Sequence, residues 1–164
     1  MTKITAGKPA PKFTLTSTSG EKYSLAEALK RGPVVLAFFK VSCPVCQFTF
    51  PFLERLHEKY GAEGVMFWGI SQDNARDTKD FCAEYGVTFP VFLDERGYPV
   101  SNDYGLTNVP TVFLVEPGGK AKISCVGFDK ADLEAIAKEL AGRRQIPLEP
   151  LFRRDEVIPA YKPG

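Results

Sequence analysis

A short apolar run that leads into a pair of cysteines constrains the fold of this chain more than any other feature. Residues 34–39, Val-Val-Leu-Ala-Phe-Phe, are wholly apolar, which is typical of a buried central strand. Residues 44–60 then carry apolar side chains at helical spacing. The sequence therefore predicts a strand that passes directly into a helix, with Cys43 and Cys46 at the junction.

The other apolar segments extend this junction into an alternating pattern of strands and helices. A Pro-Gly-Gly turn at 117–119 joins the last two strand-like runs and indicates a β-hairpin. Asp73 and Asp129 are suited to cap the second and third helices. The pattern predicts an α/β fold, a three-layer sandwich with a mixed central sheet flanked by helices. Further strands are expected at residues 65–70, 89–93, 111–115 and 120–126, and further helices at 74–85 and 130–141, ended by Gly86 and Gly142.

The chain divides into one domain and a distinct C-terminal stretch. Its 164 residues suit a single domain, and residues 1–142 contain the whole α/β pattern. Residues 143–164 hold four of the 13 prolines, which is too many for a long helix. The same stretch is too apolar for a free linker. We therefore expect an ordered, extended arm at 143–164, anchored at Leu151-Phe152 and Tyr161.

Composition excludes several classes of protein. With 21 Lys and Arg against 20 Asp and Glu, the chain lacks the basic excess of a nucleic-acid binder. The longest apolar run is six residues, far below the ~20 that span a bilayer. The first residues show no apolar signal region, so a cytoplasmic location without a membrane partner is expected. A single His and the lack of a second C-x-x-C argue against zinc, and no cofactor is expected.

The dithiol itself predicts redox chemistry. Cys43 falls near the helix N-cap, Pro44 suits the first helical position, and Cys46 follows one turn later on the same face. The unpaired N–H groups of a helix N-terminus stabilise a thiolate, and Lys40 adds positive charge. Cys43 is therefore expected to attack, and Cys46 to resolve the mixed disulfide. Two structural thiols in a loop are the alternative, which fits the strand-to-helix placement less well.

These motifs together resemble the thioredoxin-fold superfamily, and within it the TlpA/ResA-like thiol–disulfide oxidoreductases. That branch overlaps in sequence with the alkyl hydroperoxide reductase/thiol-specific antioxidant group. The likeness covers roughly residues 7–141. It is carried by Gly7–Leu15 as an N-terminal strand segment, Cys43-Pro-Val-Cys46, Pro51 as the proline inside the active-site helix, Phe89–Asp94 as a strand of an extra segment, and Val109-Pro110-Thr111 as the cis-proline loop.

The resemblance implies a thioredoxin-like sandwich and a site made by two segments far apart in the sequence. The Val109–Pro110 bond is expected to be cis, and Val109 to offer its backbone to an extended substrate, with Thr111 in the same loop. The substrate would be a disulfide-bearing protein or a small thiol or peroxide, and an upstream thiol would supply reducing equivalents. A monomer or weak dimer is expected.

Three departures from the family pattern affect the expected chemistry. Ala37 stands where thioredoxin often has a buried Asp, and Asp94 is a candidate to replace that acid. Ser42 stands where a Trp is usual. Lys40 stands where peroxiredoxins place a Thr, which counts against the alternative function of a thiol peroxidase with Cys43 as the peroxidatic cysteine. A redox-inert interaction module is a third hypothesis.

The remaining reactive residue types have structural interpretations. Cys82 and Cys125 lie in apolar segments and are expected to be buried small hydrophobes. His57 is expected to be exposed and without a catalytic role. Glu54 and Glu58 are expected to form exposed ion pairs along their helix with Arg55 and Lys59.

Overall fold

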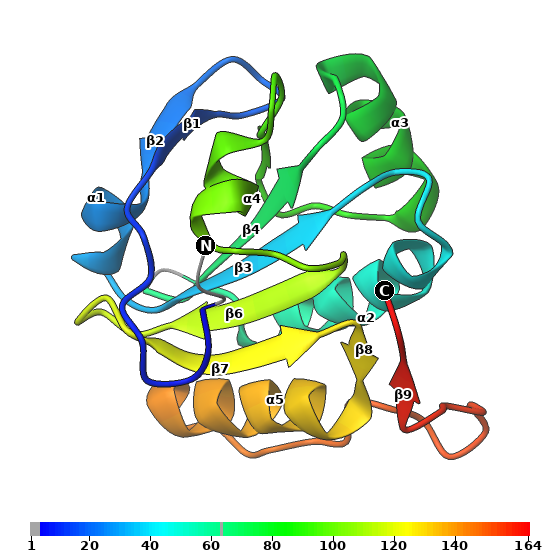
Figure 1. Cartoon of the computed structure of the whole chain (residues 1–164). Coiled ribbons are helices and arrows are strands. Elements are labelled where there is room, and N and C mark those ends of the chain that lie inside the picture. Colours follow the sequence, from blue (N-terminus) through cyan, green and yellow to red (C-terminus); the bar gives the residue numbers. More distant parts are fainter. Residues whose placement is uncertain (1–3, 63) are drawn as a thin grey trace.

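The central sheet is a mixed sheet of five strands in the order β5-β4-β3-β6-β7. The structure, a computed structural model, describes residues 4–62 and 64–164 (Figure 1). β3 is the middle strand, parallel to β4 and antiparallel to β6, and β4 is parallel to β5. The strands are β3 (Val34–Phe39), β4 (Met66–Ser71), β5 (Val91–Leu93), β6 (Thr111–Val115) and β7 (Ala121–Val126).

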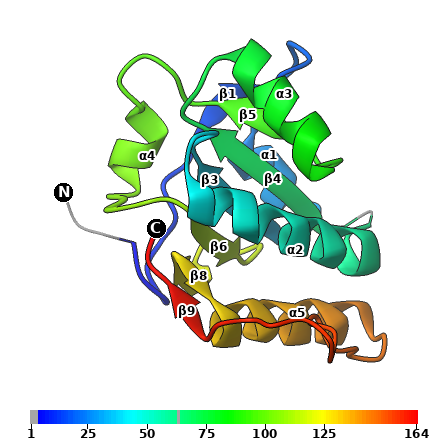
Figure 2. The same cartoon turned by 90° about the vertical axis from the view of Figure 1, so that its right-hand side faces the viewer.

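Alternation along β3 makes the two faces of the sheet apolar. Val35, Ala37 and Phe39 face one hydrophobic cluster, and the side chains between them face the other. Figure 2 shows helices on both sides of the sheet, so the predicted three-layer α/β sandwich is confirmed. The first layer holds α2 (Pro44–Tyr60), α3 (Ala75–Tyr85) and α5 (Lys130–Arg144); the other holds α1 (Leu25–Leu29), α4 (Pro99–Asp103) and the hairpin of β1 (Thr14–Thr16) and β2 (Lys22–Ser24).

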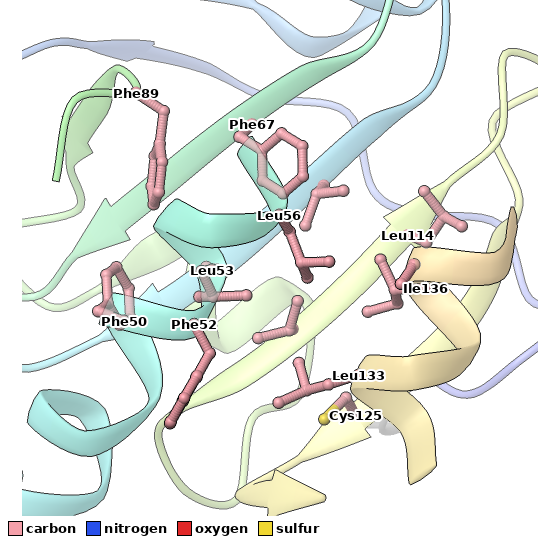
Figure 3. Close-up of a cluster of buried hydrophobic side chains, with 14 of the residues drawn as sticks. Phe50, Phe52, Leu53, Leu56, Phe67, Phe89, Leu114, Cys125, Leu133 and Ile136 are labelled. Atoms are coloured by element: carbon pink, nitrogen blue, oxygen red, sulfur yellow. The ribbon is translucent and has the colours of Figure 1, made fainter. Parts of the chain in front are cut away.

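The larger cluster lies between the sheet and helices α2 and α5, and it fixes the position of α2. Figure 3 shows Leu53 and Leu56 of α2 pointing toward Leu133 and Ile136 of α5. Each of these four side chains is at most 1% exposed. Full burial of a side chain of this size contributes on the order of 1.5–3 kcal/mol. The helix that carries the dithiol is therefore held by extensive apolar packing.

The helix ends differ from the prediction at two places. Asn74, not Asp73, caps α3, because the Asn74 side chain accepts a hydrogen bond from the backbone of Asp77. Gly142 does not end α5, which continues to Arg144 and ends where Gln145 takes a left-handed conformation with φ 55°. The prediction for α2, residues 44–60, is confirmed to the residue. No helix in the described part of the chain is long and apolar enough to cross a membrane.

Residues 145–164 form an extended arm that runs back beside α5 and ends near the start of α2 (Figure 1). The Phe152 ring packs against the rings of Phe52 and Phe128, with centroids 5.0 and 6.0 Å away. The short strand β9 (Tyr161–Lys162) pairs with β8 (Phe128–Asp129). The Tyr161 side chain is 52% exposed, so the prediction of an anchor there was wrong: its backbone, not its ring, makes the contact.

Candidate active site

The two cysteines lie where β3 ends and α2 begins, at different depths. Cys43 is the N-cap residue, and its Sγ accepts a hydrogen bond from the backbone N–H of Cys46 at 3.2 Å. Cys43 is half-buried, whereas Cys46 is completely buried. Both are free thiols in this structure. The sulfur that solvent can reach is therefore the one that receives the N–H group of the helix N-terminus.

The electrostatics of Cys46 follow from its burial. Burial raises the pKa of the Cys46 thiol well above its usual range, and the side-chain hydrogen bond with Cys43 and the negative charge of Asp73 act in the same direction. The Cys46 thiol is therefore protonated near neutral pH. This asymmetry suits an exposed attacking thiol and a buried resolving thiol.

The loop at residues 108–111 faces the dithiol. The Val109–Pro110 peptide bond is cis, as predicted. The Cys43 thiol donates to the carbonyl oxygen of Val109 at 3.5 Å. Thr111 is 2% exposed, and its hydroxyl donates to the carbonyl of Asn108 at 2.7 Å, so it shapes the loop rather than facing a substrate. The structure thus brings Cys43, Cys46, Val109 and Pro110 into one site.

The three predicted supporting residues have distinct places. Pro44 occupies the first turn of α2, where its missing N–H costs no hydrogen bond. Pro51 lies inside α2, so the carbonyl of Gln47 receives no N–H from it. The Lys40 ammonium lies 5.9 Å from the centre of the Tyr98 ring, so its charge is held toward α4.

Asp73 is a site residue that the sequence reasoning missed, having assigned it to a helix cap. Its Oδ2 accepts a hydrogen bond at 2.8 Å from the backbone N–H of Val41, in the loop that carries Cys43. Its charge also acts on Cys46. The signal in the sequence was its position two residues after β4, because the carboxyl ends of parallel strands β3 and β4 lie at the same edge.

Asp94 does not take the place of the buried acid that thioredoxins often have at the position of Ala37. It is 1% exposed, and its carboxylate accepts from the backbone N–H groups of Val100 and Ser101 at 3.1 and 2.7 Å and from the Ser101 hydroxyl at 2.7 Å. Asp94 therefore holds the start of α4.

Two predictions for α2 were wrong because they considered the helix alone. His57 is half-buried, with its ring 5.5 Å from that of Phe67 and 5.6 Å from that of Phe89. Glu54 is 6% exposed and accepts from the backbone N–H and the hydroxyl of Thr88 at 2.8 and 2.6 Å. The cations expected to pair along the helix instead reach the arm, as Arg55–Glu156 and Lys59–Glu149.

Of the other two cysteines, Cys125 is buried, as predicted, whereas Cys82 is half-buried. Burial raises the pKa of Cys82 to about 11, with a smaller contribution from the charge of Glu54. Burial raises the pKa of Cys125 to about 12. Both therefore lack the thiolate character that reactive cysteines need near neutral pH.

The C-x-x-C lies at the start of a helix and packs against a cis-proline loop that leads into β6 of a five-stranded mixed sheet. This combination defines a thioredoxin-fold dithiol protein. Residues 6–123 match the AhpC/TSA family. The chain belongs to this family.

Its relatives have been named for dithiol chemistry. The thiol–disulfide oxidoreductase ResA of Bacillus thuringiensis (strain Al Hakam) is 32% identical over 140 residues, 84% of this chain and 80% of that protein. A crystal structure assigned as the thiol:disulfide interchange protein DsbE of Chlorobium tepidum is 29% identical, covers 85% of this chain and 98% of its own, and has a TM-score of 0.75. The secreted disulfide oxidoreductase of Mycobacterium tuberculosis, 23% identical with a TM-score of 0.65, shares the fold. The prediction of a thiol–disulfide oxidoreductase is confirmed.

Proposed function

We propose that this chain reduces or exchanges disulfides, with Cys43 as the nucleophile and Cys46 as the resolving thiol. The observation that carries the proposal is the difference in depth between the two sulfurs. The reachable Cys43 caps α2 and contacts Val109 O, whereas burial keeps Cys46 protonated.

The chemistry takes two steps. The Cys43 thiolate attacks one sulfur of the substrate disulfide, whose S–S bond breaks as a Cys43–substrate disulfide forms and the first substrate thiolate leaves. Cys46 then loses its proton and attacks the Cys43 sulfur, which releases the second substrate thiolate and forms the Cys43–Cys46 disulfide. Two electrons pass from the dithiol to the substrate, and an upstream thiol returns them in a later exchange.

Val109 is proposed to orient the substrate. Its backbone flanks Cys43, and an extended segment that carried a disulfide would lie along it as an added strand. Thr111 supports this edge indirectly, through its hydrogen bond to Asn108. The partners proposed are therefore a disulfide-bearing protein or small disulfide and a thiol reductant. The cytoplasmic location stays a prediction, which cell fractionation with an antibody to the chain would test.

Disulfide reduction by the purified protein tests the proposal. Cys43→Ser is expected to abolish turnover of glutathione disulfide and insulin, and Cys46→Ser to accumulate a mixed disulfide that mass spectrometry detects at Cys43. The matched control is Cys82→Ser, a half-buried thiol of α3, which should keep full turnover. Wild-type turnover equal to that of Cys43→Ser would refute the proposed function.

A further inference from the structure

The end of the arm lies against the same Val109 backbone that faces Cys43. A Cβ atom added at Gly164 would collide with the carbonyl oxygen of Val109, and it would lie 2.6 Å from the Asn108 amide nitrogen. Residue 164 therefore passes the cis-proline loop at a distance that only a glycine permits. The sequence position gives no hint of this contact, because 55 residues separate Val109 from Gly164.

Neighbouring strand and side-chain contacts hold residues 161–164 close to this loop. Strand β9 pairs with β8, so that Lys162 lies opposite Phe128. A Cβ on Gly127 would collide with the carbonyl oxygen of Lys162, so this crossing also needs a glycine. The Lys162 ammonium lies 4.8 Å from the centre of the Phe48 ring, less than one turn beyond Cys46 in α2.

Further anchors hold the arm before it reaches the site. The Lys130 N–H donates to the carbonyl of Ala160 at 2.9 Å. The Arg55 guanidinium bonds both carboxylate oxygens of Glu156, and the Phe152 ring packs on Phe52. The contact at Val109 is therefore the last of a series of contacts along the arm.

The consequence for access differs between two kinds of disulfide. An extended polypeptide that used the Val109 edge would bring its own backbone to the place that residues 163–164 now border. A small disulfide needs only to reach Cys43, which is half-buried rather than covered. Steric competition at Val109 would therefore slow polypeptide substrates and leave small ones unaffected.

We propose that residues 161–164 form a strap over the docking edge, which makes the dithiol selective for small disulfides until the strap is displaced. This inference rests on the proposed function and adds its substrate class. If the strap is docked in about nine molecules of ten, polypeptide turnover is reduced about tenfold relative to a chain with a free strap.

The experiment compares kcat/KM for insulin with kcat/KM for glutathione disulfide. The double variant Phe152→Ala/Glu156→Gln removes the upstream anchors, and Gly164→Ala forces the strap from Val109 without altering them. Both are expected to raise the insulin-to-glutathione ratio about tenfold, with turnover of glutathione disulfide unchanged. Glu149→Gln, which removes an arm ion pair at the far end of α2, is the matched control and should leave the ratio unchanged.

A second readout does not depend on turnover. Hydrogen exchange of the Lys130 amide reports the strap, because this N–H donates to Ala160. In Cys46→Ser joined through Cys43 to a cysteine-containing peptide, that amide should exchange faster than in the glutathione adduct. Equal exchange in the two adducts, or an insulin-to-glutathione ratio unchanged in both release variants, overturns the strap while leaving the proposed function intact. Failure of the wild type and every variant to reduce either disulfide overturns the proposed function instead.

Discussion

Arg55 and Glu156 join helix α2 to the arm by two parallel hydrogen bonds, with N–O distances of 2.7 and 2.5 Å. The two residues are 101 positions apart in the sequence. A fork-to-carboxylate pair of this kind fixes orientation as well as distance. The arm is thus tied to the same helix that carries the dithiol.

The Arg55–Glu156 pair makes the docking of the arm sensitive to acid. Hydrogen bonds from Arg55, and then from the backbone of Arg153, lower the pKa of Glu156 from its ordinary 4.5 to about 2. A carboxyl with a lowered folded-state pKa stabilises the fold above its unfolded pKa, and this contribution is lost as pH falls through the folded value. We expect Glu156→Gln to lower Tm at pH 7, and the difference from wild type to vanish as pH falls from about 4.5 to about 2. A difference as large at pH 2 as at pH 7 would contradict this account.

Phe152 is expected to supply most of the apolar attachment of the arm. Phe152→Ala removes edge contacts with the rings of Phe52 and Phe128, and urea unfolding should show a loss of about 1–3 kcal/mol for this half-buried ring. Leu148→Ala, at a 53% exposed position of the same arm, serves as the control and should change stability by no more than about 0.5 kcal/mol. Equal effects of the two variants would show that the arm is not anchored at Phe152.

Asp73→Asn is expected to shift the titration of Cys46 toward lower pH. The charge of Asp73 disfavours the Cys46 thiolate, so its removal lowers the pKa of that thiol. The amide oxygen can still accept the Val41 N–H, which preserves the loop. The carbon-13 chemical shift of the Cys46 Cβ, followed against pH in a Cys43→Ser background with and without the change, measures the shift. A shift toward higher pH would show that Asp73 acts on Cys46 in another way.

Alkylation should separate the four thiols into two classes. With pKa values of about 11 and 12, Cys82 and Cys125 hold on the order of 0.1% thiolate or less at pH 8, because each unit below the pKa reduces that fraction tenfold. Iodoacetamide is therefore expected to modify Cys43 first in the reduced, folded protein. Cys46, Cys82 and Cys125 form the slow class, because burial raises the pKa of each of these thiols. Peptide mapping is the readout. Labelling of Cys82 or Cys125 at the rate of Cys43 would contradict the sheltered environment.

Peroxide should be a poor substrate. Lys40 occupies the position where peroxiredoxins place a Thr, and its ammonium lies beside the Tyr98 ring. Stopped-flow mixing is expected to show that the protein consumes hydrogen peroxide no faster than a small-molecule thiol with the same pKa. A fast reaction that Cys43→Ser removes would instead support the thiol peroxidase.

Elements with a strong local signal were predictable from the sequence. Helix α2 has apolar spacing, an N-cap and a Pro in its first turn, and its predicted bounds match the structure. The hairpin of β6 and β7 follows from a Pro-Gly-Gly turn between two apolar runs. Helices α1 and α4 are five residues each, too short for a periodic pattern to identify.

The contacts that complete the site could not be predicted, because they join segments distant in the sequence. The Asp73–Val41 hydrogen bond spans 32 residues, and the Glu54–Thr88 bonds span 34. A charged side chain on a helix is exposed unless another segment supplies its hydrogen bonds. The spacing of residues within the helix does not show which distant segment that is. The packing of the arm at Phe152 was predicted, but the residues of the domain that receive it, Phe52 and Phe128, were not, for the same reason.

The buried Glu54 carboxylate has a consequence for the dithiol. Glu54 bonds the backbone and the hydroxyl of Thr88, in the segment that leads into β5. Eight residues, or about 12 Å of helix at 1.5 Å per residue, separate it from Cys46. This contact fixes the rotation of α2 about its own axis from a point well removed from the sulfurs. The direction in which the two thiols face is therefore held in part by a contact that lies outside the C-x-x-C segment.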